Sequence, residues 1–463
     1  MVHGEVCQGE SGPRSSDPRL ARSITLSAGV THSFQGSEKC LDAVTSFDVA
    51  DYTGPPHPLG VYTLATTHVD LQTYVLRRHD TIPDRRNISQ ACDDGSQERV
   101  FQLPNSSLKD EWDSLVFEQG LPSLLLRSLT QMIDMMARPG LNLATFNWNR
   151  LSLLHGPQGS GKSTLCRALA QKLSIRLGDT FPKATLVELN ANALLSKYFG
   201  ESGKLISATF DRLYTAAQDP SILIIVVVDE IETIAGSRER STAAGECSDG
   251  LRATNQLLTA LDRLRHLPNV ITLCTSNLIE SIDRAFLDRV DIKQFIPSPS
   301  PAAIYSIFRS CLNELIRNNL ITAPTPSQSP DGPPKCKAAR LDKSGKGRTK
   351  TPATGPSSGP RTEVATPVPE VPSYSAMLLS ADDEPRSAGR RLWTLAQRCE
   401  GLSGRKLRRL PVLGLAMYTW GGPTSIDETV SALEAAVYQE LQVEKEKEEE
   451  CKGGGGVNSL ASG

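Results

Sequence analysis

Two kinds of hydrophobic pattern alternate along the chain between residues 149 and 297. Short strand-like stretches occur at residues 151–155, 185–189, 222–228, 270–275 and 293–296. Between them, large apolar residues recur every three or four positions, which predicts helices. Strands that alternate with helices and are mostly apolar along their length predict a parallel sheet covered on both faces. The predicted fold class of this region is therefore α/β.

Helical spacing also occurs on both sides of this region. Apolar residues recur at helical spacing from 112 to 136, from 302 to 321, from 392 to 418 with a break at 401–404, and from 426 to 443. Residues 23–104 show no single hydrophobic period and contain short stretches with strand propensity between prolines and glycines, which predicts a small α+β domain. Residues 323–390 are rich in Pro, Ser, Thr, Gly and Lys, and this composition predicts a disordered insertion.

Charge and cysteine content exclude several classes of function. The 463 residues carry 50 basic and 52 acidic side chains, a net charge of −2, so nothing in the overall charge favours nucleic acid or an anionic membrane as a partner. The ten cysteines form no C-x-x-C pair, so no zinc or redox site is indicated. No secretory signal and no apolar run of about 20 residues is found, so we expect a reducing compartment.

The first candidate site is a glycine-rich loop between a predicted strand and a predicted helix. The loop fits the phosphate-loop pattern G-x-x-x-x-G-K-[ST], also called Walker A, without a mismatch. Its glycines let several backbone N–H groups point at one anion, Lys162 supplies a charge for the β- and γ-phosphates, and the Ser163 hydroxyl is suited to bind Mg²⁺. The predicted nucleotide-binding residues of the loop are Gly156, Pro157, Gln158, Gly159, Ser160, Gly161, Lys162 and Ser163.

Two acidic residues after the strand at 222–228 extend nucleotide binding to hydrolysis. At the carboxyl end of a parallel strand, Asp229 is placed to hold Mg²⁺ together with Ser163. Glu230 is placed to orient and deprotonate the attacking water. Asn277 follows the next strand and is a candidate polar sensor of the γ-phosphate.

Hydrolysis also benefits from an arginine near the γ-phosphate, often supplied by a neighbouring subunit. Arg284, Arg289 and Arg405 are the candidates, and the sequence alone does not choose among them.

Several short segments resemble the pachytene checkpoint protein 2 (thyroid-receptor-interacting) family of AAA+ ATPases. The resemblance is carried by residues 111–116, 148–150, 165–173, 199–205, 288–294 and 400–405. It implies a AAA+ parallel-sheet core with a helical lid, preceded by a small α+β N-terminal domain. The domains expected are an N-terminal substrate- or adaptor-binding domain over 1–104, a large α/β domain over 105–297, a lid over 298–322 and 391–450, a disordered insertion over 323–390 and a disordered tail over 451–463.

The resemblance also implies a function. Members of the family are homohexameric rings that use ATP and Mg²⁺ to unfold part of HORMA-domain proteins, often presented by a HORMA-type adaptor. This activity serves meiotic chromosome-axis and recombination checkpoint control and silencing of the spindle checkpoint, so we expect the protein in the nucleus and the cytoplasm. No membrane and no direct nucleic-acid contact is expected.

The resemblance assigns further residues. It makes Asn277 the sensor on the third strand, Arg405 the second sensor in the lid and Arg289 the intersubunit finger; Arg284 has no counterpart in the family pattern. Lys197, Tyr198, Phe199 and Gly200 match the pore loop, with Tyr198 as the residue that grips the substrate chain.

Two alternatives stay open. One is a nucleotide-dependent scaffold without productive hydrolysis, and the other is a AAA+ ATPase that acts on DNA.

Overall fold

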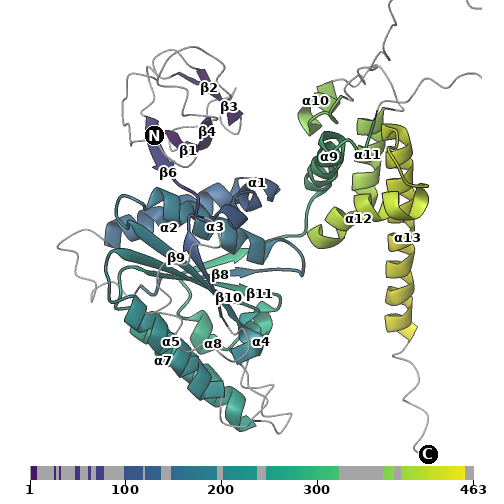
Figure 1. Cartoon of the computed structure of the whole chain (residues 1–463). Coiled ribbons are helices and arrows are strands. Elements are labelled where there is room, and N and C mark those ends of the chain that lie inside the picture. Colours follow the sequence, from purple (N-terminus) through teal and green to yellow (C-terminus); the bar gives the residue numbers. More distant parts are fainter. Residues whose placement is uncertain are drawn as a thin grey trace, which may run out of the picture. The chain divides into compact units, whose positions relative to one another are not determined.

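A six-stranded sheet forms the core of one part of the computed structural model, in the strand order β12-β8-β11-β10-β9-β7 (Figure 1). All five strands predicted between residues 149 and 297 are present and run parallel to one another, which confirms the predicted parallel sheet. A sixth strand, β7, joins the edge in antiparallel pairing with β9. The strands are β7 (Glu98–Leu103), β8 (Leu151–His155), β9 (Lys183–Asn190), β10 (Ile222–Asp229), β11 (Val270–Ser276) and β12 (Ile292–Phe295).

Helices cover both faces of this sheet because its central strands are apolar on both sides. On β10, Ile225 packs into a core shared with α2 and α3, whereas its neighbour Val226 packs into a core shared with α5 and α7. Figure 1 shows these two pairs of helices on opposite faces. The helical segments here are η2 (Ser106–Leu108), α1 (Glu111–Ser114), α2 (Leu121–Met136), α3 (Lys162–Arg176), α4 (Ala191–Leu194), α5 (Ser202–Ala216), η3 (Ile231–Thr233), α7 (Cys247–Leu264), η4 (Ile279–Ser281) and α8 (Arg284–Leu287).

The structure describes part of the chain and divides it into two units. The described residues are 2–7, 25–27, 31–32, 47–52, 61–63, 69–77, 98–117, 120–136, 148–194, 202–236, 247–322, 369–379 and 387–453. One unit comprises Met1–Ala303 with Gly401–Arg405, and the other comprises Ile304–Glu400 with Lys406–Gly463. Across the described ranges, no helix combines the length and the apolar character needed to cross a membrane.

Short strands make up the described part of the chain before β7. Four of them form a sheet in the order β3-β4-β1-β6, with β1 and β6 parallel, and two more form the pair β2-β5. They are β1 (Val2–Cys7), β2 (Thr25–Ser27), β3 (Thr31–His32), β4 (Phe47–Tyr52), β5 (Val61–Thr63) and β6 (Val69–Tyr74). Because β7 belongs to the six-stranded sheet, the expected domain boundary at residue 104 falls after a strand of the ATPase sheet.

Five helices make up most of the described part of the second unit. Four of them lie close to the predicted helical stretches, whereas one, α10 (Tyr374–Leu379), falls inside the segment predicted to be disordered. The five helices are α9 (Pro301–Arg317), α10 (Tyr374–Leu379), α11 (Ala388–Arg398), α12 (Gly404–Tyr418) and α13 (Ile426–Gly453). The gap between α11 and α12 includes residues 401–403 of the break predicted at 401–404, and Gly404 begins α12. A parallel bridge between Ile321 and Thr424 ties the chain after α9 to the chain before α13.

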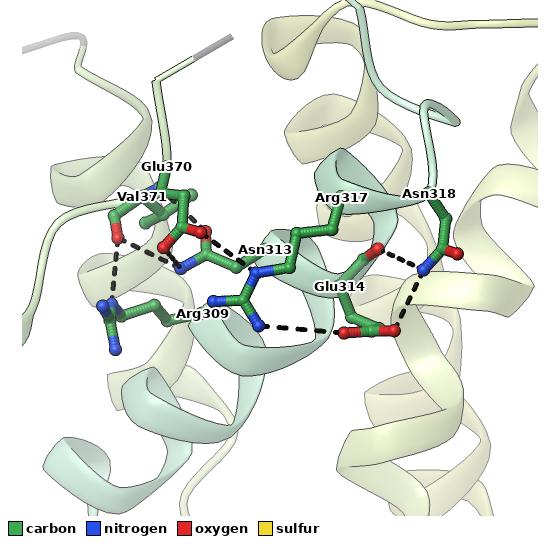
Figure 2. Close-up of polar contacts among 7 residues, drawn as sticks. All are labelled: Arg309, Asn313, Glu314, Arg317, Asn318, Glu370 and Val371. Atoms are coloured by element: carbon green, nitrogen blue, oxygen red, sulfur yellow. Dashed lines mark hydrogen bonds and ion pairs between the residues drawn. The ribbon is translucent and has the colours of Figure 1, made fainter. Parts of the chain in front are cut away.

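A short strap, residues 369–373, corrects the expected extent of the insertion. The prediction places 323–390 in one disordered segment, but the strap is bound along α9 (Figure 2). Asn313 accepts a hydrogen bond from the Val371 N–H at 2.8 Å, Arg309 donates to the Val371 carbonyl at 2.9 Å, and Arg317 donates to the Glu370 carboxylate at 3.0 Å. Composition misses this because three α9 side chains, far away in sequence, satisfy the strap's polar groups. Residues 323–368 and 380–386 lie outside the described residues.

Candidate nucleotide site

The predicted site residues follow strands whose carboxyl ends meet at one edge of the sheet. The register pairs His155 of β8 with Ser276 of β11, and Val228 of β10 with Cys274 of β11. The phosphate loop after β8, the acidic pair at the end of β10 and Asn277 after β11 are therefore neighbours. This edge is where open α/β sheets bind their ligands.

Glycine is required in the phosphate loop where other parts of the chain come close. A Cβ atom at Gly156 would lie 2.2 Å from the carbonyl oxygen of Ile296, and the residue has a φ of +146°. A Cβ atom at Gly159 would lie 2.6 Å from the Cβ of Ser403. The Gly159 carbonyl also accepts a hydrogen bond from the Gly404 N–H at 2.9 Å. The loop is thus packed between the end of β12 and the segment that begins α12.

Lys162 is held in the orientation that a phosphate-binding lysine needs. Its Nζ donates to the carbonyl oxygens of Gly156 at 2.8 Å and Pro157 at 2.7 Å. An ammonium has three protons, so one is left for a ligand in the loop. Burial lowers the pKa of Lys162 below its usual value, while the charges of Glu232 and Asp229 act in the opposite direction.

Ser163 and Asp229 lie together as a pair of oxygen ligands. The Ser163 hydroxyl donates to Asp229 Oδ1 at 2.8 Å. Thr275, buried at the end of β11, also donates to Asp229 Oδ1. Paired hydroxyl and carboxylate oxygens suit Mg²⁺, which prefers oxygen ligands.

The remaining loop residues fit a nucleotide. Ser160 is buried, and its Oγ has no hydrogen-bond partner among the described residues. Buried polar atoms are usually paired, so this atom leaves room for a phosphate oxygen or its water. Pro157 and Gln158 are exposed at the tip of the loop. The loop, Lys162 and the oxygen pair therefore match the predicted Mg²⁺-nucleotide chemistry.

Glu230 has an unusual backbone conformation. Its φ is +55° and its ψ is +51°, the left-handed region that residues other than glycine rarely adopt. The Glu230 N–H donates to Thr275 Oγ1 at 3.2 Å, and Asn192 donates to its Oε2 at 3.2 Å. Strain of this kind persists where the surroundings hold a residue for a task. This conformation turns the chain out of β10 directly after Asp229.

Asn277 is anchored through its backbone. Its N–H donates to Glu232 Oε1 at 3.0 Å, and the following N–H, of Leu278, donates to the Ser276 hydroxyl at 3.1 Å. The Asn277 side chain is half-buried and bonds to no other residue that the structure describes. Its amide is therefore free for a ligand or a water, as a sensor requires.

The three arginines are placed differently from one another. Arg289 forms a two-point ion pair with Asp262, with both distances 2.9 Å. Arg284 is exposed at the start of α8, and Arg405 is exposed in the first turn of α12, beside Gly404. The finger assignment of Arg289 and the sensor assignment of Arg405 stay predictions. The pore-loop residues Lys197, Tyr198, Phe199 and Gly200 lie outside the described residues.

Sequence reasoning missed four residues around the site: Asn192, Glu232, Asp262 and Thr275. Glu232 carried a usable signal, because it is the third carboxylate of the run Asp229-Glu230-Ile231-Glu232. Thr275 stands two residues before Asn277, but nothing in the sequence shows that its hydroxyl reaches the neighbouring strand. Asn192 and Asp262 depend on tertiary contacts that no local pattern marks.

Comparison with known proteins finds matches over most of the chain. The family described as "ATPase family associated with various cellular activities (AAA)" matches residues 152–298, and "TRIP13-like, AAA+ ATPase lid C-terminal domain" matches residues 369–441, beginning at the strap. "Pachytene checkpoint protein 2 homolog" of Danio rerio is 32% identical over 404 residues, covering 86% of this chain and 82% of that protein. The Homo sapiens protein of the same name is 32% identical over 372 residues, covering 80% and 76%.

One solved structure, "Structure of C. elegans PCH-2", shares the fold. Its TM-score is 0.67 at 24% identity, and the match covers 95% of this chain and 99% of that one.

Proposed function

Because this chain belongs to the pachytene checkpoint protein 2 family of AAA+ ATPases, we propose that it couples ATP hydrolysis to the remodelling of HORMA-domain proteins. The ATPase activity follows from the family. The main observation behind the proposal is that the residues needed to bind and hydrolyse ATP meet at one edge of the sheet. They are Lys162, Asp229, Glu230 and Asn277.

The first task of the site is to bind ATP. The backbone of the phosphate loop surrounds the phosphates, and Lys162, already bound to two carbonyl oxygens, directs its remaining proton to them. Ser163 and Asp229 would hold Mg²⁺, which neutralises charge on the phosphates when it is bound. These residues bind and orient the substrate without themselves reacting.

The second task is to activate water. Glu230 takes the proton of the attacking water, while the Asn277 amide holds that water in line with the γ-phosphate. The left-handed turn at Glu230 follows directly after Asp229, and the two acids have different partners, Ser163 for Asp229 and Asn192 for Glu230, which suits different roles. An arginine from a neighbouring subunit, Arg289 by the family resemblance, would stabilise charge that develops on the γ-phosphate.

In this proposal the energy of ATP hydrolysis drives the partial unfolding of a substrate protein. We assign the contact with the substrate chain to the pore loop Lys197–Gly200. In a ring of six identical subunits, Tyr198 of each subunit would hold the substrate at the centre. The substrate is a HORMA-domain protein, presented by a HORMA-type adaptor at the N-terminal domain. The role that follows is control of meiotic chromosome-axis and recombination checkpoint complexes and of spindle checkpoint silencing, in the nucleus and the cytoplasm.

The test is an unfolding assay with a purified HORMA-domain protein, in which Tyr198→Ala is compared with the native chain. We expect basal ATPase activity within about twofold of native and no remodelling by the variant. Equal remodelling by both chains would refute the pore assignment. No stimulation of ATPase activity by any HORMA protein, together with stimulation by DNA, would favour the DNA-acting alternative instead.

A further inference from the structure

Two side chains tie the ends of β10 and β11 together in opposite directions. Thr275, from the β11 side, donates to Asp229 and accepts the Glu230 N–H at 3.2 Å. Glu232, from the β10 side, accepts the Asn277 N–H at 3.0 Å. A side chain of β11 thus binds residues at the end of β10, and a side chain that follows β10 binds the backbone that follows β11. In the proposed mechanism Glu230 and Asn277 act on the same water. Thr275 binds the backbone N–H of Glu230, and Glu232 binds that of Asn277.

We propose that Thr275 and Glu232 are positioning residues that fix the placement of Glu230 relative to Asn277. Neither needs to touch ATP. Hydrolysis depends on this placement because the base and the sensor act on one water, and a misplacement of about 1 Å can cost about 10²-fold in rate.

The surroundings of Glu232 support a role beyond stability. One of its carboxylate oxygens, Oε1, binds the Asn277 N–H, while Oε2 is buried without a hydrogen-bond partner among the described residues. A carboxylate that served folding alone would be expected to satisfy both oxygens. Its negative charge also acts on Lys162, in the phosphate loop. Glu232 therefore bonds to the backbone of Asn277 and acts through its charge on Lys162.

Thr275 has the corresponding role on β11, where it binds the backbone of Glu230. It is buried, so its hydroxyl is fixed by the packing around β11. The strained backbone of Glu230 needs an acceptor for its N–H, and Thr275 supplies it. Loss of this acceptor would leave the turn after Asp229 free to relax toward an ordinary conformation.

Steady-state ATPase kinetics of matched variants test the proposal. Thr275→Ser and Glu232→Gln keep an oxygen acceptor, whereas Thr275→Val and Glu232→Met have a similar size without one. We expect the first pair to keep kcat within about threefold of native and the second pair to lose about 10- to 100-fold in kcat. The KM for ATP should change by less than about threefold in all four. Glu280→Ala, at an exposed position near Asn277, is the control and should behave as native.

A double-mutant cycle separates positioning from a general loss of structure. In a chain with Asn277→Ala, the Glu232 hydrogen bond to the backbone N–H at 277 remains, but the side-chain amide that it positions is gone, so Glu232→Met should cost less than about threefold in kcat. Native kcat in Thr275→Val and Glu232→Met would overturn the proposal, as would parallel losses in kcat and in nucleotide affinity. If either of these variants fails to fold in a thermal melt, the acceptor-retaining variants still test it: a loss above tenfold in Glu232→Gln or Thr275→Ser would overturn the proposal.

Discussion

The Arg289 guanidinium is bound at two points by the Asp262 carboxylate of its own chain. Nε and Nη2 each lie 2.9 Å from one Asp262 oxygen, and Nη1 donates to the Ala285 carbonyl at 2.8 Å. A paired arginine of this kind has a fixed orientation. If Arg289 completes the site of a neighbouring subunit, Asp262 sets the direction from which it is presented.

The first prediction separates a catalytic Arg289 from a structural one. Arg289→Ala should lower kcat by about 10³-fold, because a finger arginine contributes about 10³–10⁵-fold in related phosphoryl-transfer sites. Asp262→Asn, which keeps Arg289, should cost less than about tenfold. The measurement is steady-state ATP hydrolysis at a subunit concentration that supports assembly. Equal losses in the two variants would show that the pair serves structure only.

Mixing of subunits gives the control for this prediction. A chain with Arg289→Ala has an intact ATP site of its own, and a chain with Glu230→Gln has an intact Arg289. Mixed assemblies should regain part of the turnover if the arginine acts across subunits. Mixtures no more active than the sum of their parts would contradict an intersubunit role.

The second prediction concerns the acid at the turn after β10. Glu230→Gln should bind ATP as the native chain does but hydrolyse it about 10²–10⁴-fold more slowly, because the amide cannot take a proton from water. Binding of a fluorescent ATP analogue and release of phosphate measure the two steps separately. Turnover at the native rate would exclude Glu230 as the base.

The third prediction concerns the close approach in the phosphate loop. Gly156→Ala places a Cβ 2.2 Å from the Ile296 carbonyl oxygen at a φ of +146°. We expect a loss of about 1–3 kcal/mol in the free energy of unfolding from backbone strain, and weaker nucleotide binding. Gly250→Ala is the matched control, since a Cβ there meets nothing within 4 Å. In helix α7 this change should stabilise by about 0.5–1 kcal/mol.

The fourth prediction concerns the strap on α9. Asn313 is 4% exposed, and its replacement by Ala leaves the Val371 N–H without its acceptor. The free energy of unfolding should fall by about 1–3 kcal/mol. Asn318→Ala, on exposed chain just after the same helix, should change it by less than about 0.5 kcal/mol. Equal effects in denaturant titrations would mean that the strap does not stabilise the helical unit.

The fifth prediction is a pH dependence. The hydrogen bonds from Arg289 hold the pKa of Asp262 below its usual value. An acid whose pKa is lowered on folding contributes stability above its unfolded pKa, about 4, and loses it as pH falls through the folded value. The difference in Tm between the native chain and Asp262→Asn should therefore be constant from neutral pH to about 5 and shrink below about 4. A difference that is as large at pH 3 as at neutral pH would contradict this coupling.

The parallel sheet and the phosphate loop could be predicted because their signals are local. Apolar runs mark buried strands, and glycines at this spacing before Lys162, between a strand and a helix, are typical of a loop that binds phosphates. The order of the strands places Asp229 and Asn277 at one edge once the sheet is known. These inferences need only the chain direction and the rule that ligands bind at the carboxyl ends of parallel strands.

Other features could not be predicted because they depend on contacts across the fold. Nothing in the sequence links Asp262 to Arg289, which stand 27 residues apart. The antiparallel strand β7 lies before the expected boundary at 104, and its pairing with β9 is a contact across the fold that no local pattern marks. The strap at 369–373 has a composition typical of linkers and acquires its structure from α9.

The strap also has a consequence for changes in chain length. The stretch between Thr322 and the strap leaves the helical unit beside the Ile321–Thr424 bridge and returns on Asn313, so both of its ends are tied within one unit. Each doubling of a loop costs only about 0.6 kcal/mol in closure entropy. Residues added to or removed from this stretch should therefore change the free energy of unfolding little, and a reporter domain fused into it should leave ATP turnover intact.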